Sequence, residues 1–200
     1  MKKLSRKTFL LTALLGLGLA ACKDAPAPAA GAGGSSGAPA TVSVAAVAAE
    51  AKGFTVGSEM SVRRVFVFFD PQCPHCAALW QAAKPLKPQA RFVWVPVGII
   101  NATSAAQGAA ILGAPDPVAA MDAHEASLTA KQGGISAQGD LEAQRAVVAA
   151  NTQLFNRFRF SSVPTVVANH AQTGALVVQE GSMPTATLAA VLGLQPPATP

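Results

Sequence analysis

Two cysteines separated by two residues are the feature of this chain best suited to do chemistry. The segment reads Cys73-Pro74-His75-Cys76 and directly follows the apolar run 65–69. If a strand gives way to a helix here, both sulfurs lie on the first helical turn, within bonding reach of each other. A helix N-terminus favours a thiolate at Cys73, and the thiolate is the form that attacks a disulfide. The spacing therefore predicts a reversible disulfide, with Cys73 as the nucleophile and Cys76 as the buried resolving thiol.

The two residues between the cysteines are expected to tune this pair. Pro74 has no backbone donor and fixes φ, which suits the first position of a helix. His75 stabilises a thiolate if it is protonated or donates a hydrogen bond. A zinc or copper site needs further ligands, and only His124 and His170 are available, at no recognisable spacing. We interpret both as surface histidines and expect no metal and no cofactor beyond the disulfide itself, although a structural disulfide and a thiol metal-binding module stay open as alternatives.

The positive charge of the chain is concentrated at its beginning. The formal net charge is +5, and four basic residues stand before the apolar run 9–20. A basic start followed by a short apolar stretch predicts a secretory signal at residues 1–21, too short for a membrane span. Without it, eleven basic and ten acidic residues remain. This near-neutral balance does not favour a nucleic-acid partner.

The third cysteine stands at the end of this leader. Leu19-Ala20-Ala21-Cys22 resembles the lipobox of bacterial lipoproteins, which implies that Cys22 is lipidated. The alternative is an ordinary signal peptide with a chance cysteine. Lipidation also accounts for the odd thiol in an oxidising compartment. We therefore expect a lipid-anchored periplasmic protein, with the outer membrane favoured over the inner because Lys23 follows the cysteine.

Composition divides the mature chain into a tether and one folded domain. Residues 22–53 begin with Cys22 and an Ala/Gly/Pro/Ser-rich stretch, which predicts a flexible tether with a reach of about 25 Å, and end in a possible short helix. The folded domain is expected at 54–194 and a disordered tail at 195–200. Within the domain, apolar and β-branched runs predict strands at 63–69, 90–97, 163–168 and 175–179, and helical patterns cover 74–84, 102–158 and 184–192. The run 65–69 is apolar throughout, which predicts a central strand buried on both faces. Asp116-Pro117 and Asp140 are expected to cap the starts of two helices within 102–158. The order predicts an α/β domain with a mixed sheet.

This order of elements carries a family resemblance, together with Asp70-Pro71 before the cysteines and Val163-Pro164-Thr165 before the last hairpin. The domain resembles a thioredoxin-like fold with a helical insertion between the second strand and the hairpin. Over residues 60–194 it is most similar to the catalytic domains of the periplasmic DsbC/DsbG disulfide interchange proteins, DsbG in particular. The resemblance implies a cis bond at Val163–Pro164, which is otherwise rare, and a substrate-binding role for Val163, Pro164 and Thr165.

Three departures from these relatives bear on the direction of the reaction. Pro74-His75, with Val163 before the proline, resembles the oxidant DsbA. Val67 stands where thioredoxin and DsbA carry a buried acid, whereas Asp70 is what the DsbC/DsbG group shows; it can cap the strand or relay protons. Only about 40 residues precede the domain in the mature chain, without room for a dimerisation domain, so we expect a monomer.

The sequence therefore predicts an extracytoplasmic thiol–disulfide oxidoreductase that exchanges disulfides with protein substrates and acts as an oxidant. A DsbG-like isomerase or reductase, a non-catalytic thiol metal-binding module and a scaffold that recognises folded partners through the insertion are the alternatives. A membrane partner, DsbB-like or DsbD-like, would reset the cysteine pair.

Overall fold

The computed structural model describes residues 41–197. The predicted signal peptide, the lipidation site at Cys22 and most of the predicted tether lie outside the described residues. Among the described helices, none combines the length and the apolar character needed to cross a membrane.

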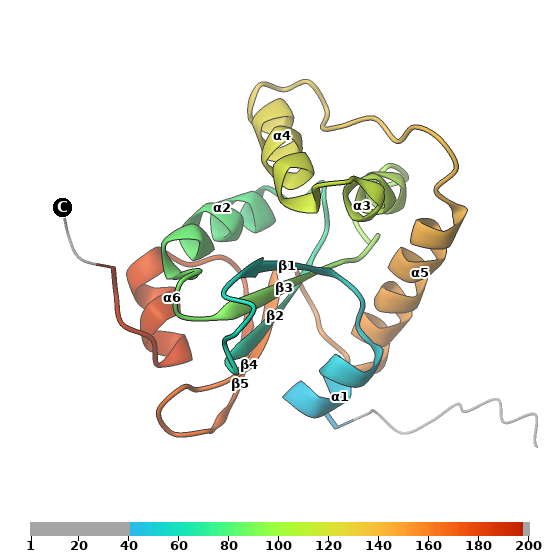
Figure 1. Ribbon diagram of the computed structural model, residues 1–200. Helices are drawn as coiled ribbons and strands as arrows, with labels where there is room; N and C mark the ends of the chain where they lie inside the picture. Colours follow the sequence, from blue (N-terminus) through green and yellow to red (C-terminus); the bar gives the residue numbers. More distant parts are fainter. Residues whose placement is uncertain (1–40, 198–200) are drawn as a thin grey trace, which may run out of the picture. The chain divides into compact units, whose positions relative to one another are not determined.

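The centre of the structure is a five-stranded mixed sheet with the strand order β1-β3-β2-β4-β5 (Figure 1). Strands β2 and β3 are parallel, whereas β1 pairs antiparallel with β3 and the hairpin β4–β5 pairs antiparallel with β2. The central position predicted for the strand before the cysteines is confirmed, since every residue of β2 after Arg64 is buried. The strands are β1 (Phe54–Gly57), β2 (Arg64–Phe69), β3 (Arg91–Pro96), β4 (Thr165–Asn169) and β5 (Leu176–Glu180).

Helices flank the sheet, and three of them form the insertion between β3 and β4 that the sequence predicts. They are α1 (Val44–Glu50), α2 (Pro74–Ala83), α3 (Ser104–Gly113), α4 (Pro117–Thr129), α5 (Glu142–Arg157) and α6 (Thr185–Leu192), with a short 3₁₀ helix at Lys84–Leu86 after α2. The insertion comprises α3, α4 and α5. Its second helix starts where the sequence predicts, because the Asp116 carboxylate accepts hydrogen bonds from the backbone of Val118 and Ala119.

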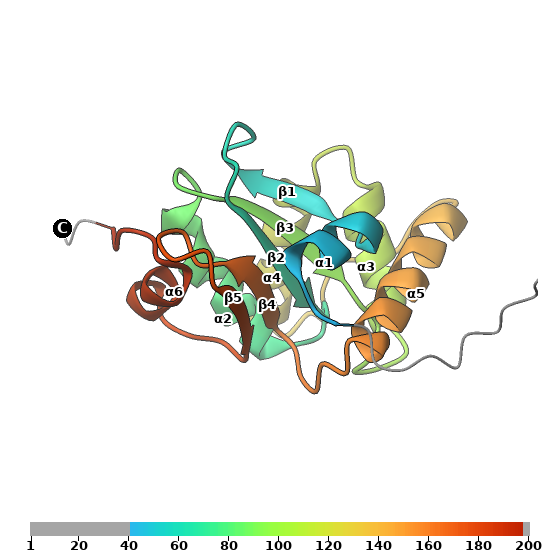
Figure 2. The ribbon, with the colours of Figure 1, turned by 90° about the horizontal axis from the view of Figure 1, so that it is seen from below.

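Two hydrophobic cores form because side chains alternate between the faces of β2. On one face, Val67 packs in a core with α2, α4 and α6, where Trp80 and Trp94 meet edge to face at 4.9 Å between ring centroids. On the other face, Phe68 packs with α1 and α5 and lies 6.0 Å from the Phe155 ring. Figures 1 and 2 show α1 on the opposite side of the sheet from α2 and α4. The sheet thus fixes β2, and with it the start of α2, from both sides.

The packed part of the chain begins before residue 54, ahead of the predicted domain boundary. Val47 of α1 is fully buried against the second core. The side chain of Asn151 on α5 bonds both backbone groups of Lys52, accepting from its N–H at 3.0 Å and donating to its carbonyl at 2.7 Å. The short predicted helix therefore packs as part of the domain, because its Val and Ala side chains cover apolar residues of β2.

Three smaller details also differ from the sequence predictions. Strand β1 was not predicted; it is a four-residue edge strand without the apolar run of the central strands. Asp140 was expected to cap α5, but Leu141 is the N-cap residue and Asp140 accepts a bond from the backbone of Glu142 instead. Gln195, placed in the tail, exchanges hydrogen bonds with Gln89. Local patterns thus located the elements but missed contacts between distant segments.

Candidate active site

The cysteine pair lies where β2 passes into α2, as the sequence predicts. Cys73 is the N-cap residue of α2, and Pro74 occupies the first helical turn. The Cys73 N–H donates to the Asp70 carbonyl at 3.0 Å, and the Cys73 carbonyl accepts from Cys76 N–H at 3.0 Å. Both cysteines are free thiols, so the structure represents the reduced pair. Both sulfurs therefore sit on the first turn of the helix.

The two thiols have opposite electrostatic environments although they belong to the same helical turn. A hydrogen bond from the Cys76 side chain is the main cause that lowers the pKa of Cys73, to about 6, against the opposing effect of burial. Backbone hydrogen bonds from Cys76 and His75 and the charge of His75 lower it further. Cys76 is fully buried, and this burial, together with its bond to Cys73, raises the pKa of Cys76 far above its ordinary value. At neutral pH the pair therefore holds one thiolate, on Cys73, and one thiol, on Cys76.

The loop before β4 forms one wall of this site. The Val163–Pro164 peptide bond is cis, the form that the family resemblance implies. The Val163 carbonyl oxygen lies 3.5 Å from Cys73 Sγ. The Pro164 carbonyl instead accepts from Gly181 N–H at 2.8 Å, which ties the loop to the end of the hairpin. Thr165 is fully buried at the start of β4, and its hydroxyl donates to the Ser162 carbonyl. Residues far apart in sequence thus meet at Cys73 Sγ.

The two residues between the cysteines face outward. Pro74 and His75 are both exposed, while the sulfurs on either side of them are covered. His75 Nδ1 lies 3.4 Å from the hydroxyl of Ser182, in the segment between β5 and α6. The imidazole is therefore accessible from solvent while its charge acts on Cys73.

Asp70 is fully buried and binds the backbone around the end of β2. One carboxylate oxygen accepts from Gln72 N–H at 2.8 Å, and the other accepts from Ile99 N–H at 2.7 Å and Ile100 N–H at 2.9 Å. These bonds match the strand-capping role that the sequence allowed. They join the loop that carries the cysteines to the loop after β3.

The helical insertion holds the same loop from its other side. The Gln72 side chain donates to the Gln107 side chain of α3, and both amides also donate to the Gly133 carbonyl, Gln107 at 2.7 Å. His124 of α4 lies 2.7 Å from the Pro71 carbonyl. The loop before Cys73 is thus attached to the insertion by its backbone and by a side chain.

The interpretation of His124 as a surface residue is wrong. Its side chain is fully buried, with Nε2 against the Pro71 carbonyl and Nδ1 accepting from Ile135 N–H at 3.2 Å. Burial lowers the pKa of His124, although the bond to Pro71 opposes this effect. The neutral ring therefore links the backbone at Pro71 to the backbone at Ile135. His170 is partly exposed and accepts long hydrogen bonds from the Gln172 and Thr173 backbone.

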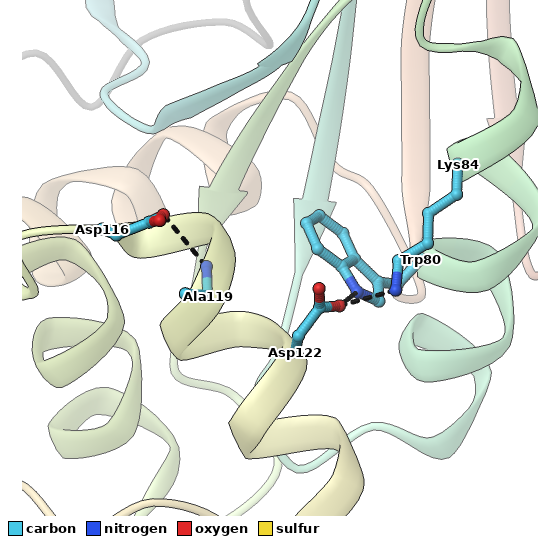
Figure 3. Close-up of polar contacts among 5 residues, drawn as sticks. All are labelled: Trp80, Lys84, Asp116, Ala119 and Asp122. Atoms are coloured by element: carbon cyan, nitrogen blue, oxygen red, sulfur yellow. Dashed lines mark hydrogen bonds and ion pairs between the residues drawn. The ribbon is translucent and has the colours of Figure 1, made fainter.

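Charged side chains join α2 to α4 next to the site (Figure 3). The Asp122 carboxylate accepts from Trp80 Nε1 at 2.7 Å and pairs with Lys84 Nζ at 2.6 Å. Partial burial raises the pKa of Asp122, but the bonds from Lys84 and Trp80 outweigh it and hold the pKa below the usual value. One turn along α4, Glu125 is buried at 4% exposure, and neither of its carboxylate oxygens has a hydrogen-bond partner among the described residues. Glu125 is not among the site residues predicted from the sequence.

A signal for these residues exists in the sequence. Asp122, His124 and Glu125 are the only titratable residues between positions 117 and 130, in a stretch that is otherwise rich in alanine. A spacing of three places Asp122 and Glu125 on one face of a helix. The pattern does not tell whether that face is buried. Within residues 41–197, no three His, Cys, Asp or Glu side chains are grouped so that they could hold a metal ion.

Comparisons with known proteins agree with this architecture. A family described as a thioredoxin-like domain matches residues 58–195. The chain is 32% identical over 136 residues to the thiol:disulfide interchange protein DsbG of Pseudomonas aeruginosa, covering 66% of this chain and 51% of that protein. It is 43% identical over 67 residues to DsbG of Escherichia coli, covering 32% and 26%. The chain thus spans about half the length, or less, of the curated relatives it matches.

Solved structures with the same arrangement have more distant sequences. The catalytic domain of Proteus mirabilis ScsC aligns with a TM-score of 0.58 and 15% identity over 74% of this chain and 96% of that domain. A disulfide interchange protein from Neisseria gonorrhoeae aligns with a TM-score of 0.55 and 21% identity over 71% and 94%. At these identities the likeness establishes the shared fold.

Proposed function

Because the chain belongs to the family of thioredoxin-like domains, we propose that it is a thiol–disulfide oxidoreductase that uses Cys73 and Cys76 on protein substrates. One observation carries this proposal. A thiol with a pKa of about 6 lies at the start of a helix, directly beside a second thiol that burial keeps protonated. Such a pair supplies a nucleophile and a resolving group within one turn.

The exchange proceeds through a mixed disulfide on Cys73. In the oxidising direction, a substrate thiolate attacks Cys73 Sγ, the Cys73–Cys76 bond breaks, and Cys76 leaves with the electron pair and takes a proton. A second substrate thiolate then attacks the substrate sulfur that is bonded to Cys73. The substrate disulfide forms, and Cys73 leaves as a thiolate. The substrate loses two electrons and gains a disulfide, and the cysteine pair is reduced. The reverse sequence reduces a substrate.

The cis-proline loop is the proposed docking element. The Val163 carbonyl lies 3.5 Å from Cys73 Sγ, so an extended substrate segment that pairs with this loop brings its own sulfur next to the nucleophile. Pro74 and His75, next to Cys73, are exposed and open to the same substrate. Val163, Pro164 and Thr165 therefore position the substrate, while Cys73 and Cys76 exchange electrons.

The environment of Cys73 favours oxidation of substrates. Interactions that stabilise its thiolate exist only in the reduced pair, because the disulfide carries no charge. They therefore stabilise the reduced protein and make its disulfide a stronger oxidant. The competing role, a DsbG-like isomerase or reductase, is supported by the names of the curated relatives.

Two measurements test this function. Equilibration with glutathione buffers gives the reduction potential, and an oxidant requires a potential above that of the glutathione couple. A potential below it would support the reductase role. In cells, Cys76→Ala should retain mixed disulfides on Cys73, whereas Cys73→Ser with Cys76 intact serves as the matched control and should retain none. Failure of the wild-type pair to form a reversible disulfide would refute the proposal.

We also propose that the domain works from a lipid anchor at Cys22 on the periplasmic side of a membrane, by preference the outer one, and is reset by a DsbB-like or DsbD-like membrane partner. The basic and apolar leader ending in Leu19-Ala20-Ala21-Cys22 supports this placement. Metabolic labelling with a fatty acid followed by membrane fractionation tests it. Cys22→Ser should lose both the label and the membrane association, while retaining the redox equilibrium of the other two cysteines.

A further inference from the structure

Glu125 is a buried acid that the exchange cycle above does not use. Its side chain is 4% exposed, and both carboxylate oxygens lack a hydrogen-bond partner among the described residues. An ionised carboxylate without partners is costly in such a place. A neutral carboxylic acid avoids most of that cost. This side chain is therefore suited to gain and lose a proton. Its neighbours determine which change in charge drives that proton transfer.

Contacts between α2 and α4 place Glu125 beside the first turns of α2. Asp122, one turn earlier on α4, bonds Trp80 in the later part of α2 and Lys84 directly after that helix (Figure 3). His124, next to Glu125, contacts the Pro71 carbonyl, just before the cysteines. Between these two contacts lies a groove of about 620 Å³ between α2 and α4, and its lining includes Ala77 and Glu125. The carboxyl group thus lies along the end of α2 that carries Cys73.

The charges around Glu125 come from both helices and from the cysteine pair. Burial is the main cause that raises the pKa of Glu125, to about 7. The negative charges of Cys73 and Asp122 raise it further, whereas Lys84 lowers it. The neutral ring of His124 is engaged on both nitrogens, and Cys76 keeps its proton. Cys73 is the one of these groups whose charge disappears when the pair is oxidised.

We propose that Glu125 takes up a proton when the cysteine pair is reduced and releases it when the disulfide forms, so that up to about neutral pH the buried site does not hold a carboxylate next to the Cys73 thiolate. The inference rests on the proposed thiol–disulfide activity and adds a proton acceptor to it. Glu125 responds to the charge of Cys73 and touches no substrate. It is therefore a residue that accepts and holds the proton, and not a catalytic residue.

Protons and electrons balance in this scheme. Oxidation of two substrate thiols to a disulfide releases two electrons and two protons. The electrons break the Cys73–Cys76 bond. Cys76 takes up one proton and becomes a thiol, and Glu125 takes the other as Cys73 becomes a thiolate. On reoxidation by the next partner, Glu125 returns its proton through the groove that it lines.

The test is the pH dependence of the redox equilibrium with glutathione. Oxidation of glutathione releases two protons in this pH range, so the equilibrium constant changes tenfold per pH unit only where the protein takes up one proton instead of two on reduction. Below the pKa of Cys73, about 6, both thiols bind protons in the reduced pair. With Glu125 as acceptor, uptake of the second proton continues up to about pH 7. Cys73 and Glu125 titrate as one interacting pair. The plot of the logarithm of the equilibrium constant against pH should therefore change slope once, near pH 7.

Glu125→Gln keeps the shape of the side chain and removes the titrating group. We expect the break to move down to about pH 6 and, above pH 7, the variant to be up to about tenfold more oxidising than the wild type, the equivalent of one proton over one pH unit. Below pH 5.5 the two proteins should agree. Glu142→Gln, on the exposed start of α5, is the matched control and should reproduce the wild-type curve.

The possible outcomes separate this inference from the proposed function. A purely structural role of Glu125 would shift the equilibrium by a similar factor at every pH, and that result overturns the inference. A wild-type curve that already breaks at pH 6 overturns it without any variant, so the test does not depend on the folding of Glu125→Gln. In both cases a measurable equilibrium leaves the thiol–disulfide function standing. Only the absence of a reversible disulfide would remove both.

Discussion

The low pKa of Cys73 has a direct consequence for the stability of the reduced protein. The folded structure lowers this pKa from 9.0 to about 6, whereas in the unfolded chain the thiol titrates at its ordinary value. The folded state therefore binds fewer protons at Cys73 between these two values. A group of this kind stabilises the fold above its unfolded pKa, and the contribution is lost as the pH falls through its folded pKa. We predict that reduced wild-type protein gains stability relative to Cys73→Ser as the pH rises from 5.5 to 8.

The magnitude follows from the two pKa values. At about 1.36 kcal/mol per pKa unit, the thiolate contributes roughly 0.2 kcal/mol at pH 5.5, about 1.4 at pH 7 and about 2.7 at pH 8. Repulsion from Glu125 reduces the gain, so we expect the stability difference between the two proteins to grow by about 2 kcal/mol over this range. Cys76 does not contribute here, because its raised pKa acts only above pH 9.

Urea denaturation under reducing conditions at both pH values measures this difference. Thiolate absorbance at 240 nm on the same samples gives the pKa of Cys73 independently. Oxidised wild-type protein, which has no thiolate, is the control and should not show the gain. A stability difference between reduced wild type and Cys73→Ser that stays constant within about 0.5 kcal/mol from pH 5.5 to 8 would refute the reasoning.

Three further predictions concern the residues that hold the site. His124→Gln should lower the free energy of unfolding by about 2–3 kcal/mol at pH 7.5, because it disturbs both hydrogen bonds of a buried side chain, including that to Pro71. Burial lowers the pKa of His124, so the wild type is more stable than the variant above pH 6.5. In urea titrations this difference should shrink as the pH falls below 6.5. Gly134→Ala should lower stability by about 2–4 kcal/mol, because φ is +90° and a Cβ would lie 2.5 Å from the His124 ring, whereas Gly133→Ala, at φ +86° in open space, should cost only about 1 kcal/mol; equal losses would contradict the role of the close contact. Asp70→Asn replaces an oxygen that accepts backbone N–H bonds by a donor, so thermal unfolding should show a loss of about 3 kcal/mol, and an unchanged melting temperature would rule out the capping role.

Much of the fold was predictable because its central elements have strong local patterns. The run that becomes β2 is apolar on both faces, as a central strand must be, and the order of elements identifies the mixed sheet and the insertion. The cysteine spacing predicts a nucleophile at Cys73, because elementary helix geometry places this residue at the helix start. The cis bond at Val163–Pro164 depended on the family resemblance, since the residues alone make it improbable.

The remaining parts of the site depend on contacts between segments far apart in sequence. His124 is buried because the Pro71 carbonyl, 53 positions earlier, meets its ring. Glu125 is buried because α4 packs along α2, and an alanine-rich helix with a weak polar pattern does not indicate which face is covered. Strand β1 is short and lies at the sheet edge, where partners more than propensity decide the conformation. In each case the deciding interaction is absent from the local sequence.

The helical insertion covers the sheet, and it also fixes the backbone of the loop that carries Cys73. Cys73 needs a fixed backbone, because its pKa depends on hydrogen bonds and charges that act over short distances. Asp70 fixes the loop from the β3 side, while Gln107 and His124 fix it from the insertion. The same helix that supplies His124 also supplies the acid at Glu125. A change that loosens α4 should therefore alter the redox equilibrium and its pH dependence together, whereas a change confined to the cis-proline loop should alter substrate binding while leaving the proton balance of the pair intact.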